Sequence, residues 1–167
     1  MKPARGTCPR FRRDGARCPA WVNRVLPALA EEKILEDLAV LPDPQERLAH
    51  LMERATRRPP VPEKDRNDTT RVPGCVSRVW LTATLVNGQC RFQVAANSPM
   101  VLGLVRFICD VYDGAPPAEA AAFQSEIITR SGLHRFLSPT RLHGLDRTRH
   151  RIRALAASLS TPPSHNL

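Results

Sequence analysis

One cysteine, Cys75, occupies the position in this chain best suited to chemistry. It follows Pro73-Gly74 and precedes an apolar stretch that begins at Val76. Proline fixes its own φ angle and glycine adopts backbone angles closed to other residues, so the pair predicts a tight turn. Reactive side chains concentrate on loops that rigid elements hold. The pattern favours a nucleophilic thiol at a loop tip, against the commoner fate of a free cysteine as a small buried hydrophobic residue.

Three blocks of sequence resemble one protein family, and Cys75 lies in the first. Residues 71–80, Arg-Val-Pro-Gly-Cys-Val-Ser-Arg-Val-Trp, resemble the active-cysteine loop of the SufE/CsdE sulfur-acceptor proteins. Residues 137–145, Leu-Ser-Pro-Thr-Arg-Leu-His-Gly-Leu, resemble the family block Leu-[Ser/Thr]-Pro-[Ser/Thr]-Arg-x-x-Gly-Leu. A weaker third block, residues 101–104, resembles the start of the helix after the second strand. The resemblance extends over residues 30–158.

The resemblance implies a sulfur-transfer function. Cys75 would take persulfide sulfur from a PLP-dependent cysteine desulfurase of the SufS/CsdA type, stimulate that enzyme, and pass the sulfur to a cluster scaffold such as SufB. The attack of a thiolate on a persulfide parallels thiol–disulfide exchange. This chain would then be a sulfur-transfer partner rather than a stand-alone enzyme, without a cofactor of its own, since PLP belongs to the desulfurase. The resemblance also implies a monomer or weak homodimer and a loop that shifts to expose the cysteine.

Three further residues are candidates for binding the partner. Arg141 begins a helix, where the helix dipole favours acids, and this misplacement indicates a role other than helix stability. Arg71 belongs to the cysteine-loop block. A guanidinium close to Cys75 would lower the pKa of the thiol. Asn97 stands where the family often carries an acid, so a partner contact through that acid is in doubt.

The other residues of the cysteine loop and the remaining cysteines have simpler interpretations. Ser77 and Trp80 are expected to be structural, because they fall on opposite faces of a strand. Cys90 and Cys109 lie in apolar segments and are expected in the core. Five cysteines are an odd number, which favours reduced thiols in a cytoplasm over a secreted disulfide framework. The last two, Cys8 and Cys18, lie nine residues apart with no histidine near them, and a metal site there is not expected.

The net charge of +9 raises nucleic-acid binding as an alternative function. Residues 1–27 contain seven basic residues and one acid, so six of the nine net charges belong to this segment. The remaining chain is only mildly basic. Its main basic run, Arg147 to Arg153, alternates and does not fall on one helix face. We therefore expect no nucleic-acid partner.

A second alternative is an iron–sulfur scaffold of the IscU type, which shares the expected overall fold. Such a scaffold needs about three converging thiolate or imidazole ligands. Only Cys75 falls on an expected loop of the domain, and the histidines show no ligand spacing. The sequence therefore favours sulfur transfer over cluster assembly on this chain.

Hydrophobic periodicity predicts an α+β domain with a small antiparallel sheet packed against helices. Asp43-Pro44 and Ser98-Pro99 are helix-start signals, and Asn87-Gly88 predicts a type I′ hairpin turn. The expected elements are helices over 29–40 and 44–55, a strand over 76–86, a return strand through Cys90, Phe92 and Val94, and helices over 100–112, 116–123 and 138–158, with 124–137 open between helix and loop. The resemblance adds a third strand just before Cys75, which makes the sheet a meander.

The expected domain organisation is a single unit with two tails. Residues 1–28 form a basic, disordered extension, residues 29–159 the domain, and residues 160–167 a disordered tail. The longest apolar runs are far too short to span a bilayer, and the N-terminus has no secretory signal. We expect a soluble, cytoplasmic protein.

Overall fold

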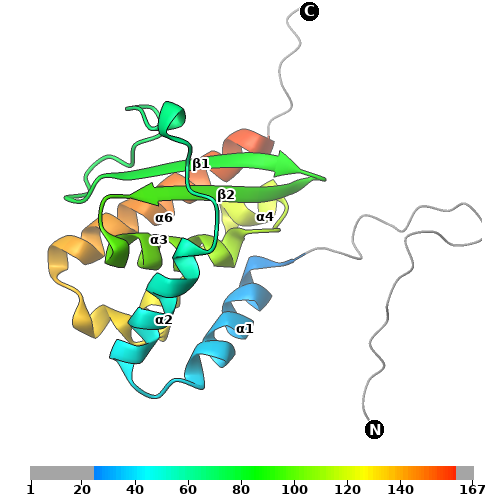
Figure 1. Ribbon diagram of the computed structural model, residues 1–167. Helices are drawn as coiled ribbons and strands as arrows, with labels where there is room; N and C mark the ends of the chain where they lie inside the picture. The colour runs from blue at the N-terminus through cyan, green and yellow to red at the C-terminus, as the bar shows by residue number, and fades with distance from the viewer. Residues whose placement is uncertain (1–24, 161–167) are drawn as a thin grey trace, which may run out of the picture.

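The helices and the β-hairpin pack around one central helix, α3. The structure is a computed structural model that describes residues 25–160. In Figure 1 the hairpin lies across α3 and α6, and α1 and α2 pack on α3 away from the strands. The elements in chain order are α1 (Pro27–Ala39), α2 (Pro44–Thr56), the 3₁₀ turn η2 (Glu63–Asp65), β1 (Val79–Val86), β2 (Gln89–Ala96), α3 (Pro99–Tyr112), α4 (Pro117–Ala122), α5 (Ile127–Arg130), the 3₁₀ turn η3 (Leu133–Phe136) and α6 (Pro139–Ser160). The expected α+β class is confirmed.

Proline and a capping side chain begin both α2 and α3. The Asp43 carboxylate accepts a hydrogen bond from the Gln45 N–H at the start of α2. The Ser98 hydroxyl accepts one from the Val101 N–H at the start of α3. Each cap satisfies an N–H group that has no partner within its helix. Both starts were predicted from sequence.

The hairpin forms with the predicted turn. Asn87 and Gly88 have φ angles of 52° and 75°, as a type I′ turn requires, and β1 pairs antiparallel with β2. Cys90, Phe92 and Val94 are all buried on the face that meets the helices. Leu85, near the turn, is 48% exposed.

Two strand predictions need correction at the cysteine loop. The first strand begins at Val79 instead of Val76, and the third strand is reduced to a single bridge between Arg71 and Trp80. Pro73 has no N–H to donate, and Gly74 has a φ of +78°, so the chain turns away from β1 after the bridge. Residues 73–78 therefore form a loop, and the sheet has two strands.

The side chains of Arg106 in α3 and of Asp113, directly after α3, bind the free edge of β2. The Phe92 N–H donates to the Asp113 carboxylate (2.8 Å), and the Phe92 carbonyl accepts from Arg106 Nη1 (2.9 Å). Asp113 is also ion-paired with Arg58. These groups satisfy backbone polar atoms that a further strand would otherwise pair.

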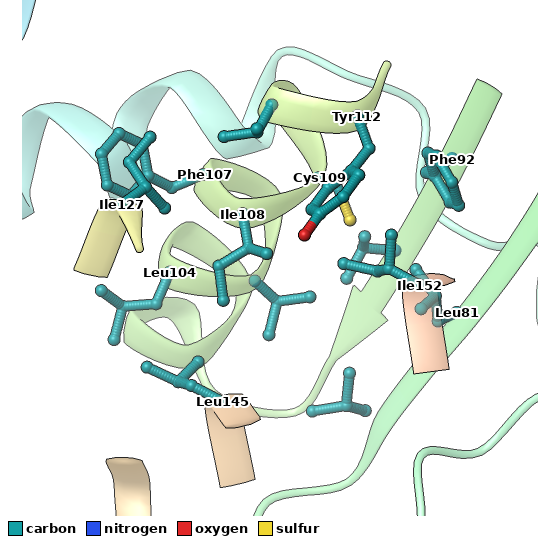
Figure 2. Packing of buried hydrophobic residues seen from close by; sticks show 14 of the residues in the cluster. Leu81, Phe92, Leu104, Phe107, Ile108, Cys109, Tyr112, Ile127, Leu145 and Ile152 are labelled. Carbon is teal, nitrogen blue, oxygen red and sulfur yellow. The ribbon is translucent and has the colours of Figure 1, made fainter. Parts of the chain in front are cut away.

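The core is centred on α3, whose side chains reach toward the strands, α5 and α6 (Figure 2). Cys90 and Cys109 are both fully buried there, as expected. Burial, with a smaller effect from the Asp113 charge, raises the pKa of the Cys90 thiol to about 11. The residues labelled in Figure 2 are Leu81, Phe92, Leu104, Phe107, Ile108, Cys109, Tyr112, Ile127, Leu145 and Ile152.

The expected tails and the two N-terminal cysteines fall almost wholly beyond the described part of the chain. Cys8 and Cys18 lie outside it, as do residues 161–167. Helix α1 begins at Pro27, inside the segment assigned to the N-terminal extension, and α6 ends at Ser160, one residue beyond the expected domain end. The division at residues 28 and 159 stays a prediction.

Candidate active-site cysteine

Cys75 lies on the loop between the Arg71 bridge and β1, with its side chain against α6. The loop is anchored on one side by Val72, whose side chain is buried and whose N–H donates to the Val79 carbonyl (2.8 Å). The positive φ of Gly74 then turns the chain toward α6. The result is a half-buried thiol at a loop tip.

The thiol is held by the backbone of α6. Cys75 Sγ lies 3.2 Å from the Gly144 carbonyl oxygen, to which the S–H donates. The same oxygen accepts a hydrogen bond from Thr148 Oγ1 (2.9 Å), which itself lies 3.9 Å from the sulfur. Thr148 is fully buried, and its hydroxyl is held beside the thiol by the bond to Gly144.

Gly144 allows this close approach. A Cβ atom at this position would lie 3.3 Å from Cys75 Sγ. Glycine inside a helix costs about 1 kcal/mol relative to alanine, and the thiol contact is the reason for this one. From sequence, Gly144 was named only within the motif of residues 137–145, and Thr148 was not predicted to be a functional residue. An isolated glycine within a helical pattern was the available signal.

A cavity of about 460 Å³ adjoins the thiol. Its walls come from the Cys75 loop, the first turns of α3 and the first half of α6, so the three sequence blocks that resemble one family meet here. The lining residues are Cys75, Val76, Ser77, Val101, Leu104, Val105, Ser138, Thr140, Arg141, Gly144, Leu145 and Thr148. Ser77 faces this cavity from the loop, so its assignment to a strand face was wrong.

The surroundings favour the neutral thiol. Burial raises the pKa of Cys75, and the hydrogen bond to Thr148 and the positive charge of Arg71 offset this only in part. A protonated thiol can donate to Gly144, whereas a thiolate has no proton to give and would face a carbonyl lone pair. In this position Cys75 is therefore held in its less reactive form.

The structure brings two of the three predicted partner-binding residues to the thiol. Arg71 is exposed and close enough for its charge to act on Cys75. Arg141 is exposed at the wall of the cavity. Asn97 instead binds the backbone of Arg78, the last residue of the loop. Its side-chain oxygen accepts a hydrogen bond from the Arg78 N–H (3.0 Å), and its own N–H donates to the Arg78 carbonyl (3.1 Å). Asn97 thus fastens the end of the cysteine loop.

Trp80 lies beyond the loop and is half-buried, with the Arg66 guanidinium 5.9 Å from its ring centroid.

Within residues 25–160 no three His, Cys, Asp or Glu side chains are grouped so as to hold a metal ion. In the same range no helix combines the length and the apolar character needed to cross a membrane.

Comparison with known proteins decides the family. Residues 32–156 match the model of SufE, the Fe-S metabolism associated domain. This chain belongs to the SufE family. Membership associates the protein with iron–sulfur metabolism.

Curated SufE relatives and one solved structure agree with this assignment. An uncharacterised SufE-like protein of Rhizobium etli is 32% identical over 128 residues, which cover 73% of this chain and 86% of that protein. One from Synechocystis is 30% identical over 112 residues, 67% of this chain and 70% of that protein. The solution structure of a hypothetical protein from Thermus thermophilus has a TM-score of 0.66 at 24% identity, covering 79% of this chain and 97% of that one, and shows the same fold.

A segment similar to this chain also occurs within a larger protein. The chloroplastic quinolinate synthase of Arabidopsis thaliana is 30% identical over 96 residues, which are 57% of this chain but only 13% of that protein.

Proposed function

We propose that this SufE-family protein accepts sulfur from a PLP-dependent cysteine desulfurase on Cys75 and stimulates that enzyme. The Cys75 thiolate attacks the terminal sulfur of the desulfurase persulfide. A new S–S bond forms on Cys75, the S–S bond on the desulfurase breaks, and the desulfurase cysteine leaves as a thiolate. The step is an exchange without net oxidation or reduction. The persulfide sulfur then passes to a cluster scaffold such as SufB.

One observation carries this proposal. Cys75 is the thiol among residues 25–160 that lies on a loop, while Cys90 and Cys109 are fully buried in the core. Its side chain opens on a cavity and is retained by one S–H contact to a helix backbone. A thiol held this way is protected at rest and released by movement of a short loop, which suits transfer between two proteins.

The proposal assigns partner contacts to Arg71 and Arg141, with Asn97 acting through the loop end that it fastens. The protein would work as a monomer or weak homodimer. The reaction belongs in the cytoplasm, where free thiols stay reduced.

Intact-mass spectrometry tests the transfer. The protein is incubated with a purified SufS-type desulfurase and cysteine, and the expected result is a gain of one sulfur atom that a reductant removes. Cys75→Ser should gain none and should lose stimulation of the desulfurase. The matched control is the double variant Cys8→Ser, Cys18→Ser, which should still gain sulfur. A full gain in Cys75→Ser would contradict the proposal.

A further inference from the structure

The outer edge of β2 is satisfied within the chain near the hairpin turn. The Cys90 N–H donates to the Ala115 carbonyl (2.8 Å), and the Cys90 carbonyl accepts from the Gly114 N–H (2.9 Å). The N–H and carbonyl of Phe92 bind side chains at the end of α3. Neither residue has a backbone group left for a further strand.

The outer edge of β1 is paired only at its start, where the segment before the Cys75 loop lies against it (Figure 1). The Val79 carbonyl and the Leu81 N–H bind that segment, each at 2.8 Å. Because alternate residues of an antiparallel strand point their backbone groups to the same side, the N–H and carbonyl groups of Ala83 and Leu85 also point outward. In the part of the chain that the structure describes, these four groups have no hydrogen-bond partner.

This open part of β1 also lacks the features that block strand pairing. No Asp, Glu, Lys, Arg or Pro occurs between Arg78 and Arg91, and the register of the hairpin runs without a bulge. Leu85 and Val86 are 48% and 46% exposed. Natural sheet edges are usually blunted by charge, proline or a bulge, so an edge without them is suited to accepting a strand.

We propose that this edge pairs with the same edge of a second copy of the chain. The two β1 strands run antiparallel about a two-fold axis at Thr84. Ala83 of each copy then lies opposite Leu85 of the other, and the two pairs form four backbone hydrogen bonds. The joined sheet has four strands, in the order β2, β1, β1, β2.

The side chains of β1 fit their own copy in this register. Thr84 meets its counterpart across the axis, which is a favourable cross-strand pair, and the larger Leu85 lies beside the smaller Ala83. The chain has a net charge of +9, so contact through most other surfaces would bring like charges together. An uncharged segment avoids this repulsion, which favours a second copy as the occupant.

The nearest charge on the same face of the sheet is Arg91, which lies opposite Thr84 within the hairpin. In the four-stranded sheet the two Arg91 residues are three strand spacings apart, or ~14 Å. That separation exceeds the Debye length of ~8 Å at physiological ionic strength, so their repulsion is largely screened.

Pairing at this edge stops at two copies. Once both β1 edges are used, the outer edges of the joined sheet are those of β2, where Cys90 and Phe92 are already satisfied. A two-fold contact of this kind is closed and does not extend into a fibre. The contact involves only the last residues of one short strand, so the dimer is weak and depends on concentration.

The dimer leaves both Cys75 loops free. Each β1 begins at Val79, directly after the loop, whereas the two-fold axis lies near the hairpin turn. At ~3.3 Å per residue, antiparallel pairing places the two Val79 residues ~33 Å apart. Each copy can therefore react at its own thiol, and the pairing stands apart from the proposed function.

Sedimentation velocity of the full chain in reductant tests the pairing, over a range from about 5 to about 500 μM. We expect a monomer–dimer equilibrium with a dissociation constant of ~0.1 mM, as suits a small interface, and no larger species. In two-dimensional NMR spectra of the amides, the signals of Ala83 and Leu85 should shift with protein concentration more than those of Cys90 and Phe92.

Charged variants at the axis sharpen the test. Thr84→Lys places like charges opposite each other and should raise the dissociation constant at least tenfold. Thr84→Glu should also weaken self-association. An equimolar mixture of the two variants should associate within about threefold of the wild type, because each lysine then meets a glutamate. The control Gln93→Lys adds the same charge on β2, separated from this edge by β1, and should behave as the wild type.

Three results would overturn the inference. They are a wild-type chain that stays monomeric over the whole range, a dimer that Thr84→Lys leaves unchanged, and a mixture that associates no more tightly than Thr84→Lys alone. Persulfide formation on Cys75 tests the proposed function separately. Thr84→Lys should accept sulfur as the wild type does, so a chain that dimerises without accepting sulfur would remove the proposed function and leave the pairing standing.

Discussion

The Cys75 thiol and the Gly144 carbonyl oxygen, 69 residues apart in sequence, are joined by an S–H···O contact of 3.2 Å. This contact fixes the cysteine loop on α6 and depends on the protonation state of the thiol. A thiolate would be repelled by the carbonyl oxygen at that distance. Deprotonation and release of the loop are therefore linked, and each favours the other.

Replacing Gly144 by alanine should loosen the loop. The added Cβ would lie 3.3 Å from Cys75 Sγ. Overpacking costs typically about 1–3 kcal/mol, so we expect Cys75 to react with iodoacetamide about tenfold faster at pH 7.5. Better helix propensity should keep the melting temperature near that of the wild type. An alkylation rate equal to that of the wild type would show that the contact does not restrain the loop.

Replacing Thr148 by valine should make the thiol less acidic. The Thr148 hydroxyl lowers the pKa of Cys75, and valine keeps the shape of threonine without the oxygen. The pH profile of Cys75 alkylation should move to higher pH in Thr148→Val and stay in place in Thr148→Ser, which retains the hydroxyl. Identical profiles for the three proteins would exclude the hydrogen bond as an influence on the thiol.

Alkaline pH should lower the free energy of unfolding through ionisation of Cys75. Because burial raises the pKa of this thiol in the folded protein, its contribution to stability is full below the pKa of the unfolded chain. That contribution is lost as the pH rises through the pKa of the thiol in the folded protein. The urea midpoint should therefore fall more steeply between pH 8 and 10 in the wild type than in Cys75→Ala. Cys90 titrates in both proteins, so their difference isolates Cys75; parallel curves would contradict the linkage.

Two glutamates that pair with the same arginine allow the stability contribution of a buried ion pair to be compared with that of an exposed one. Glu31 is 2% exposed, pairs with Arg130 (3.0 Å) and accepts the Glu126 N–H (3.2 Å), whereas Glu32 is 56% exposed and pairs with the same arginine. Glu31→Gln should lower the free energy of unfolding by about 2 kcal/mol or more, because it leaves imperfectly paired groups buried. Glu32→Gln should cost less than about 1 kcal/mol. Urea denaturation measures both, and equal losses would refute the distinction.

Local signals in the sequence predicted most of the secondary structure. The Asn87-Gly88 turn, the Ser98 cap and the buried alternation of Cys90, Phe92 and Val94 depend on nearby residues and were correct. The strand start and the third strand were wrong, because Pro73 has no N–H to donate and the positive φ of Gly74 turns residues 73–78 away from β1. The edge of β2 is closed by Asp113 and Arg106, a long-range solution that no local pattern shows.

Sequence by itself determined the family, the reactive thiol as a candidate and the α+β class, because short motifs and hydrophobic periodicity encode local chemistry and the faces that must be buried. Tertiary structure alone decided that Gly144 and Thr148 hold the thiol and that Arg141 lies at the wall of the cavity beside it. These residues come from segments far apart in the chain. Their relation is set by how α6 packs against β1 and α3, and packing distances of about 3 to 4 Å are a property of the assembled core rather than of any segment.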